Sequence, residues 1–206
     1  MKDALIIIDI QNDFTAGGSL AVPEGNEIIP IVNQLQNQFD LVVATQDWHP
    51  KNHGSFASNH PGKKAFETID LNGLEQILWP DHCVQESPGA HFHPDLQTEK
   101  IQTIFRKGMD PAIDSYSGFY DNGHRKSTGL SGYLKGLEVK HLYFCGLAAD
   151  YCVYYSLKDA IKEGFRCTLF SDATKAISVE NFSVIKKELI QMGVELRSFG
   201  KESITL

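Results

Sequence analysis

Apolar runs alternate along this chain with segments in which apolar residues recur every three or four positions. The runs cover residues 4–10, 41–45, 101–105, 141–145 and 166–170, with a further candidate at 194–199. They lack polar alternation, which is typical of parallel strands buried on both faces. Helical spacing predicts helices at 26–39, at 130–137, from Cys152 to Gly164, and over an apolar stripe at 182–190.

The alternation of strands and helices predicts the fold class. We expect an α/β, three-layer, doubly wound sandwich, with a mostly parallel sheet of about six strands and helices on both faces. No repeat, low-complexity segment or linker divides the chain, so residues 1–206 are expected to form one domain. In such sheets ligands bind beyond the carboxyl ends of the strands, and the residues that follow each strand are therefore the first candidates for chemistry.

A long stretch at 46–100 lacks clear periodicity, and within it only residues 71–78 are predicted to form a short helix. It holds five of the chain's eight prolines and six of its eight histidines. Irregular segments of this length are uncommon in compact domains unless they serve a function.

Composition narrows the class of protein. The chain is 42% hydrophobic and 22% charged, with a net charge of −7 and no basic cluster, which argues against a nucleic-acid partner. No apolar run approaches the roughly 20 residues that span a bilayer, and the first residues do not resemble a signal peptide. Four widely spaced cysteines without a CxxC pair indicate free thiols and a cytoplasmic location.

Two strand ends carry acid–base and nucleophile candidates. Asp9 and Asp13 follow the first strand, and we expect Asp9 to hold neighbouring loops while Asp13, further out, is the better base. Cys152 lies where the fourth strand passes into a helix, whose amino end favours thiolate over thiol. Backbone N–H groups near Ala148 and Cys152 could receive an oxyanion. A buried, inert thiol is the alternative reading of Cys152 alone.

The other two strand ends offer a metal site and a cation. Asp47 and His49 lie two apart in extended backbone and point to the same side, and His82 supplies a third ligand. Surface histidines are an equally good reading of the spacing alone. His53 is a candidate outer partner of a ligand. Lys107, after the third strand, could lower a thiol pKa or stabilise an anion, although most single lysines are merely solvated.

Together these strand ends resemble the nicotinamidase group of the isochorismatase-like cysteine hydrolases. The resemblance covers essentially the whole chain, and its motifs occur in family order. They are Asp9-x-Gln11-x-Asp13-Phe14, Gly17-Gly18-Ser19-Leu20, Asp47-Trp48-His49-Pro50, Trp79-Pro80-Asp81-His82-Cys83, Phe105-Arg106-Lys107-Gly108, Tyr116-Ser117-Gly118-Phe119 and Gly146-Leu147-Ala148-Ala149-Asp150-Tyr151-Cys152-Val153.

The resemblance implies a role for each candidate. Cys152 would be the nucleophile, Asp13 its proton acceptor and Lys107 the third catalytic residue. One divalent metal ion would bind Asp47, His49 and His82. Zinc is the first choice, with iron or manganese as alternatives. A cis peptide at Leu147–Ala148 would aim the two oxyanion-hole amides, those of Ala148 and Cys152.

The resemblance also implies a substrate. Nicotinamide would be deamidated to nicotinate and ammonia through a thioester, as a step of NAD salvage, and pyrazinamide would be cleaved as well. Phe14, Trp79 and Tyr116 would wall the ring pocket, although aromatic core is an equal reading for Trp79. Family members often assemble, so a homo-oligomer is an option. The alternatives are another small-amide amidase or isochorismatase-type hydrolase, and a binding module without catalysis.

Overall fold

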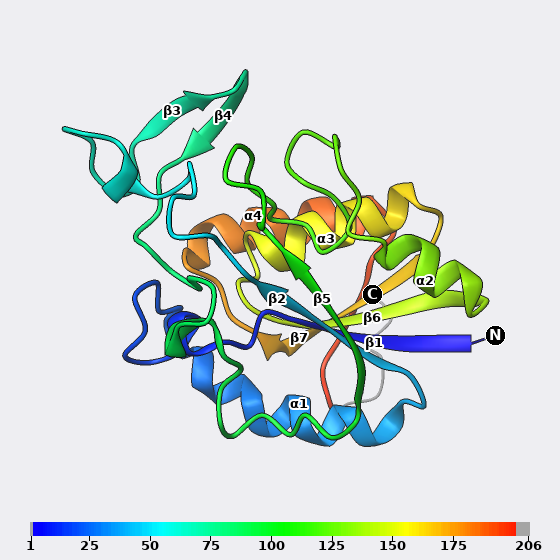
Figure 1. The fold of residues 1–206 in the computed structure, drawn as a ribbon. Coiled ribbons are helices and arrows are strands. Elements are labelled where there is room, and N and C mark those ends of the chain that lie inside the picture. Colours follow the sequence, from blue (N-terminus) through cyan, green and yellow to red (C-terminus); the bar gives the residue numbers. More distant parts are fainter. Residues whose placement is uncertain (1, 201–206) are drawn as a thin grey trace.

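The computed structural model describes residues 2–200, which form a central sheet with helices on both of its faces (Figure 1). The six strands lie in the order β5-β2-β1-β6-β7-β8, and each neighbouring pair is parallel. This confirms the predicted fold class. The prediction of one domain over 1–206 extends beyond the described residues and stays a prediction.

The apolar runs form the strands of this sheet. Their bounds are β1 Lys2–Ile8, β2 Val42–Asp47, β5 Ile101–Lys107, β6 Val139–Gly146, β7 Arg166–Thr174 and β8 Glu195–Arg197. The helices are α1 Ile29–Leu35, α2 Leu130–Gly136, α3 Cys152–Lys162 and α4 Val179–Gln191. The apolar stripe predicted as one helix at 26–39 is divided into α1 and short 3-10 turns at Gly25–Ile28 and Gln36–Gln38.

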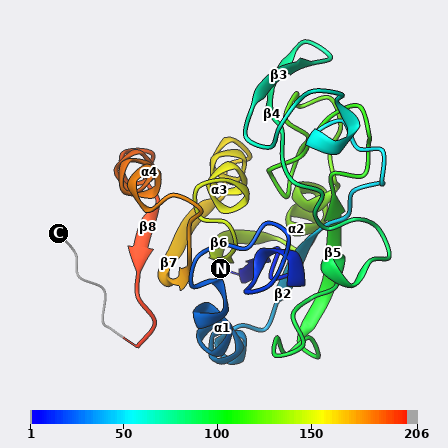
Figure 2. The same cartoon turned by 90° about the vertical axis from the view of Figure 1, so that its left-hand side faces the viewer.

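Strand β1 shows why its sequence is apolar without alternation. Ala4, Ile6 and Ile8 pack into a core that includes residues of α2, α3 and α4, whereas Leu5 and Ile7 pack into a second core with α1. All five side chains are fully buried. Figures 1 and 2 show α1 on one face of the sheet and α3 and α4 on the other. Burial on both faces removes the polar positions that an exposed strand would carry.

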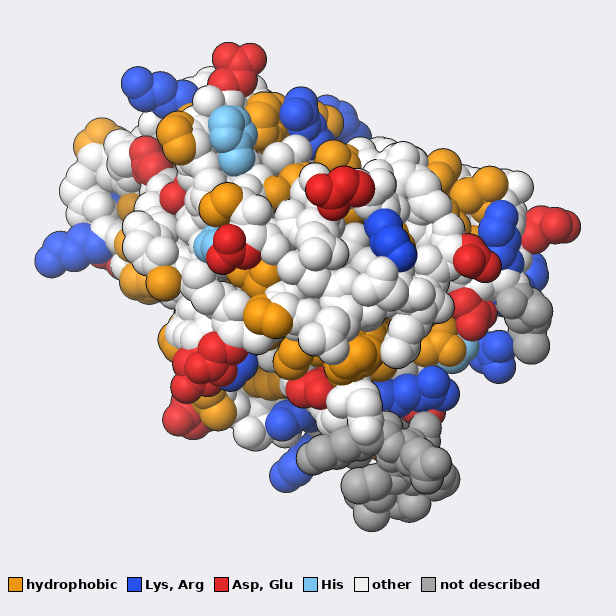
Figure 3. All heavy atoms as spheres, turned by 90° about the horizontal axis from the view of Figure 1, so that it is seen from below, with side chains coloured by type: hydrophobic (Ala, Val, Ile, Leu, Met, Phe, Trp, Pro, Cys, Tyr) orange, Lys and Arg blue, Asp and Glu red, His pale blue; other side chains and the backbone are white. Residues whose placement is uncertain are grey.

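The surface near α1 carries charges of both signs. Figure 3, which views the molecule from below Figure 1, shows acidic and basic side chains interspersed with hydrophobic ones on this face. Within residues 2–200, no helix combines the length and apolar character that crossing a membrane requires.

The helix predicted at 71–78 is wrong, because this segment belongs to a β-hairpin. Strand β3, Thr68–Leu71, pairs with the antiparallel strand β4, Leu74–Ile77. The turn residues Asn72 and Gly73 have φ of 55° and 85°. Positive φ at both central residues defines the type I′ turn, for which Asn-Gly is the preferred sequence. The hairpin projects away from the main sheet (Figures 1 and 2).

The turn geometry yields a stability prediction. A Cβ at position 73 would contact nothing within 4 Å, so Gly73→Ala costs backbone strain alone. We expect a loss of about 1–2 kcal/mol, and therefore a melting temperature lower by roughly 2–8 °C. The matched control is Gly132→Ala in α2, where the added Cβ is also free of contacts. That change should raise stability, because Ala is the better helix former. Equal melting temperatures for the two variants would contradict the turn assignment.

Candidate active site

Four adjacent strand ends bring the candidate residues together. Strand register pairs Asp47 at the end of β2 with Lys107 at the end of β5. On the other side of β2, β1 ends at Ile8, which pairs with Gly146 at the end of β6. The chain builds outward from β1 to β2 and β5, and then returns to β6, so strand order reverses between β1 and β6. This switch point is where open α/β sheets bind ligands.

Gly146 is required at this switch point. Its φ is +116°, and a Cβ there would lie 2.0 Å from the carbonyl oxygen of Ile8. Only glycine can adopt this conformation so close to a neighbouring strand. The residues after it, Leu147 to Tyr151, lead directly into α3, which begins at Cys152.

Lys107 is the centre of the site. Its side chain is fully buried, and its Nζ lies 2.6 Å from Asp47 Oδ1, 2.9 Å from Asp9 Oδ2 and 3.4 Å from Cys152 Sγ. It also donates to the carbonyl oxygen of Ser115 at 3.1 Å. Burial opposes the charge, but the two carboxylates raise the pKa of Lys107 well above its usual value. The ammonium therefore remains charged at neutral pH.

Cys152 lies near this ammonium, and its thiol is protonated rather than ionised. Burial raises the pKa of Cys152 well above its usual value, because a thiolate would lose its hydration. Lys107 opposes this effect, while the charges of Asp9 and Asp47 add to it. Burial therefore outweighs the helix amino end, which by itself favours the thiolate. A base is needed to remove the thiol proton when the sulfur reacts.

Asp9 is placed to be that base. Its Oδ1 accepts from the Thr45 hydroxyl at 2.6 Å, and its Oδ2 faces Lys107 without a well-aligned hydrogen bond. Potential ligand atoms of Asp9, Asp47 and Cys152 lie within 4.8 Å of one another. Burial raises the pKa of the Asp9 carboxyl, more than Lys107 lowers it, which makes its carboxylate a stronger base.

The structure contradicts the expected place of Asp13. Its half-buried carboxylate accepts from the backbone N–H of Cys83 at 2.7 Å and of Ser19 at 3.3 Å. No hydrogen bond or ion pair recorded within residues 2–200 joins it to Lys107 or Cys152. The sequence held a signal for Asp9, since it directly follows the last residue of β1 and therefore remains at the sheet edge. Four residues further on, the chain has left that edge.

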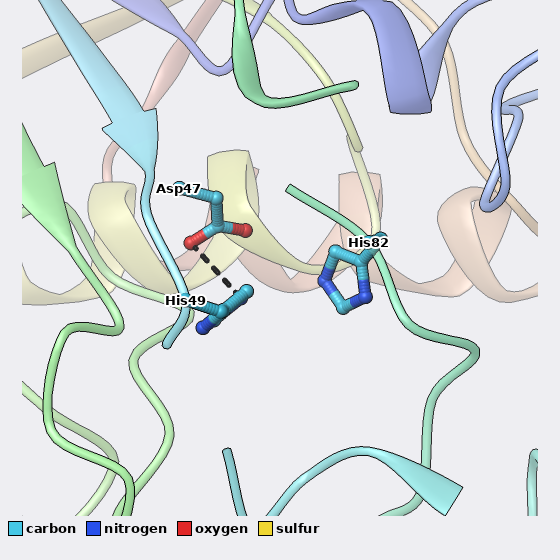
Figure 4. Close-up of side chains that lie close together, drawn as sticks. All are labelled: Asp47, His49 and His82. Atoms are coloured by element: carbon cyan, nitrogen blue, oxygen red, sulfur yellow. Dashed lines mark ion pairs between the residues drawn. The ribbon is translucent and has the colours of Figure 1, made fainter. Parts of the chain in front are cut away.

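The predicted metal ligands Asp47, His49 and His82 converge from β2 and two loops (Figure 4). Their ligand atoms lie within 4.8 Å of one another, and all three side chains are buried. His49 Nε2 is 3.6 Å from Asp47 Oδ1, a separation that two ligands of one ion can adopt. The net charge of the buried group formed by Asp9 (−1), Asp47 (−1) and Lys107 (+1) is −1. A divalent cation would offset this negative charge.

Hydrogen bonds prepare both imidazoles for this role. His49 Nδ1 lies 2.9 Å from the carbonyl oxygen of Gly108, and His82 Nδ1 lies 2.7 Å from that of Pro80. Because a carbonyl only accepts, each Nδ1 carries a hydrogen, so Nε2 is the nitrogen that would bind a metal. Burial opposes a charged His49 ring, but Asp47 raises the pKa of His49, so its Nε2 can hold a proton that a metal would displace. Burial, with the neighbouring His49, lowers the pKa of His82 to about 4, so this ring is neutral at pH 7. The donor set therefore fits a divalent metal ion.

His53 differs from these two rings. Its Nδ1 accepts from the Ser55 backbone N–H at 3.2 Å, which leaves the hydrogen of the neutral ring on Nε2. Burial lowers the pKa of His53 to about 4, and its Nε2 has no hydrogen-bond partner in the part of the chain that the structure describes. A protonated nitrogen cannot bind a metal, so this tautomer favours an outer role, beside the His49 ring at 4.4 Å.

Sequence reasoning missed Asp114. This buried carboxylate lines the same pocket as the metal ligands, and it groups with His49 and His53 as a second set of potential ligands. Gln76 donates to its Oδ2 at 3.0 Å. Its position, two residues before the motif that begins at Tyr116, is the sequence signal that could have found it.

One pocket joins the reactive and ligating groups. Phe14, Trp79 and Tyr116 line it together with Cys152, Asp47, His49 and His82. Trp79 Nε1 donates to the Tyr116 hydroxyl at 3.2 Å, which fixes two aromatic walls relative to each other. The structure thus places Trp79 in the pocket wall, although the residue is also well buried.

Two residues that line this pocket, Ala148 and Cys152, have backbone N–H groups without a hydrogen-bond partner among residues 2–200. The peptide Leu147–Ala148 is cis. Neighbouring amides are engaged: Ala149 N–H donates to Lys175, and the N–H groups of Tyr151 and Val153 donate to Ala148. Within residues 2–200, no recorded hydrogen bond uses the N–H of Ala148 or of Cys152. Both residues line the pocket, so these amides are available to an anion.

The donor set predicts metal binding. Chelated protein should bind one zinc ion per chain in calorimetric titration, and excess zinc at about 100 times the dissociation constant should add about 2.7 kcal/mol of stability. His82→Ala should weaken binding strongly, because it removes a ligand. His91→Ala, which alters an exposed histidine, should not. Equal zinc affinity in both variants would show that the site is elsewhere.

Comparisons with known proteins agree with this arrangement. The family model described as "Isochorismatase domain" matches residues 3–199. The nicotinamidase of Acinetobacter baylyi is 47% identical over 193 residues, which cover 93% of this chain and 90% of that protein.

Two solved structures are similar throughout. A nicotinamidase/pyrazinamidase of Acinetobacter baumanii has a TM-score of 0.93 and 46% identity, with 96% of each chain covered. A pyrazinamidase of Pyrococcus horikoshii in complex with zinc has a TM-score of 0.80 and 39% identity, with 97% of this chain and 100% of that chain covered. With its fold, its strand-end site and these matches, the chain belongs to the isochorismatase family.

Proposed function

We propose that this protein is a metal-assisted cysteine hydrolase that deamidates nicotinamide to nicotinate and ammonia, and that it also cleaves pyrazinamide. The observation that carries the proposal is the shared pocket, in which the Cys152 sulfur faces the metal donor set between aromatic walls. Its relatives in Acinetobacter baylyi and Acinetobacter baumanii bear the names of these activities.

The pocket suits a flat heteroaromatic amide. Phe14, Trp79 and Tyr116 offer apolar faces to a ring. Asp47, His49 and His82 would hold the divalent cation, which as a Lewis acid would take the pyridine nitrogen and so orient the ring. We propose zinc because the Pyrococcus horikoshii relative was solved with it, while iron or manganese suits the same donors.

Acylation begins with the neutral thiol. Asp9 Oδ2 accepts the thiol proton as the Cys152 sulfur forms a bond to the amide carbonyl carbon. The carbonyl π electrons move onto oxygen, and the amides of Ala148 and Cys152 stabilise the resulting oxyanion. Lys107 remains protonated throughout. Its positive charge stabilises both the carboxylate and the negative charge that develops on sulfur.

The tetrahedral intermediate then collapses to a thioester. The C–N bond breaks, Asp9 returns its proton to the leaving nitrogen, and ammonia departs. Asp9 next takes a proton from water, whose oxygen attacks the thioester carbon. The C–S bond breaks, the sulfur regains a proton, and nicotinate leaves. One water molecule is consumed per amide, and the protein returns to its starting state.

The surroundings of the reaction follow from the same chemistry. A small amide is the expected partner. In line with this, solved relatives carry nicotinate, the acid that deamidation of nicotinamide would yield, or the inhibitor nicotinaldehyde. All four cysteines are unpaired thiols, so we place the reaction in the reducing cytoplasm, where nicotinate returns to NAD. Another small-amide substrate on the same scaffold is the alternative.

The proposal predicts ammonia release from nicotinamide and from pyrazinamide by zinc-loaded protein. Chelation should abolish the release and zinc should restore it. Cys152→Ala should bind nicotinamide in calorimetry but release no ammonia, because the nucleophile is gone. If fully metallated wild-type protein released none from either amide, the proposed substrate class would be wrong. Full activity in Cys152→Ala would instead disprove the nucleophile.

A second prediction distinguishes the two acidic candidates. Asp9→Asn should lower kcat by about 10²–10⁴-fold, the usual contribution of a general base. Asp13→Asn keeps an oxygen that can accept from the backbone, so its kcat at saturating zinc should fall by much less. Steady-state ammonia assays on both variants, with folding checked by circular dichroism, measure the contrast. A larger loss in Asp13→Asn would return the role of base to Asp13.

A further inference from the structure

Asp13 is fastened to the loop that carries a metal ligand. Its Oδ2 accepts from the backbone N–H of Cys83 at 2.7 Å, across 70 residues of sequence. Cys83 directly follows His82. A carboxylate that accepts a backbone N–H makes a charge-assisted bond, which is stronger than a neutral one.

The backbone of Cys83 links both imidazole ligands through the two peptide groups on either side of its Cα. Its carbonyl oxygen accepts from the backbone N–H of His49 at 3.0 Å, while its own N–H is held by Asp13. Cys83 therefore joins the backbone of His49 to that of His82. Any rotation of the backbone at Cys83 would therefore move one imidazole ring relative to the other.

The backbone of Cys83 needs such support. Its φ is +46°, a left-handed conformation that is unfavourable for non-glycine residues. Its fully buried side chain leaves little room for another arrangement. Strained conformations of this kind persist where surrounding interactions over-determine them, and they gather at functional sites.

Asp13 is itself held rigidly. Ser19 N–H contacts its Oδ1 at 3.3 Å, and Gly89 packs so closely that a Cβ there would lie 2.0 Å from Oδ2. Leu20 N–H donates to its backbone carbonyl at 3.0 Å. A carboxylate held by these contacts can keep the His82–Cys83 peptide group in one orientation.

We propose that Asp13 is a positioning residue that sets the relative orientation of His49 and His82 through the backbone of Cys83, and so tightens metal binding. This role rests on the proposed metal-dependent function. It also accounts for a carboxylate in a family motif that lies away from Lys107 and Cys152. Residues that orient metal ligands in this way typically contribute about 10–100-fold to metal affinity.

The test is the zinc dissociation constant, measured by competition with a chromophoric chelator on purified, chelated, full-length protein. Asp13→Ala removes the acceptor and should weaken binding about 10–100-fold. Asp13→Asn keeps one acceptor oxygen without the charge, so it should weaken binding by clearly less than Asp13→Ala. Asp81→Ala is the matched control, because it removes an exposed carboxylate beside His82 that accepts from the Ser58 hydroxyl rather than from the backbone.

Each outcome decides a separate point. Equal affinity in wild type and Asp13→Ala would overturn the positioning role and leave the proposed function intact. Equal weakening in Asp13→Asn and Asp13→Ala would show that charge, not orientation, is responsible, and would also overturn it. Absence of zinc binding in wild type would overturn the metal site itself. If Asp13→Ala fails to fold by circular dichroism, Asp13→Ser, whose hydroxyl is too short to reach Cys83, replaces it.

Discussion

The buried ion cluster around Lys107 is the constraint on which the site depends. One ammonium, fully enclosed, contacts carboxylates that come from the ends of two neighbouring strands, at Asp9 and Asp47. Any one of these charges alone would be strongly unfavourable in the interior, so the three must be present together and correctly aligned. The parallel register of β2 and β5 supplies that alignment by pairing Asp47 with Lys107. The pairing of β2 with β5 therefore also brings Asp47 into contact with Lys107.

The cluster also separates two tasks within one pocket. Asp47 belongs both to the cluster and to the metal set, and Lys107 with the two imidazoles lowers its pKa in spite of burial. It therefore remains a carboxylate at neutral pH, able to bind a metal ion. For Asp9, by contrast, burial prevails and raises the pKa. The two carboxylates that contact Lys107 therefore differ in pKa. The lower pKa suits Asp47 as a metal ligand, and the higher pKa suits Asp9 as a proton acceptor.

The sequence could predict the sheet because apolar runs buried on both faces have a local signature, as β1 shows. It could also predict that Asp47, His49, His82, Lys107 and Cys152 would meet, because each closely follows a strand end or belongs to a motif of the family. The sequence of β3 and β4 was predicted to form a helix because such short segments fit both the helical and the strand spacing of apolar residues. The Asn72-Gly73 pair is the signal that distinguishes the hairpin. The sequence favours Asp13 over Asp9 as the base, and the structure reverses this order, because Asp9 contacts Lys107 whereas Asp13 accepts from the Cys83 N–H. Which of them reaches Lys107 depends on where β1 ends against its neighbours.

The pKa of the Cys152 thiol could not be predicted from the sequence either. A helix amino end lowers it and burial raises it, and only the depth of Cys152 in the fold decides between them. A protonated thiol is what makes the Asp9 carboxylate necessary.

The most direct test is therefore the ionisation of Cys152, followed by thiolate absorbance near 240 nm during a pH titration of the chelated protein, with Cys152→Ala as the reference. We predict no thiolate signal from Cys152 at neutral pH, and its appearance only in alkaline solution. A full thiolate signal at pH 7 would contradict the account, because Asp9 would then have no proton to accept.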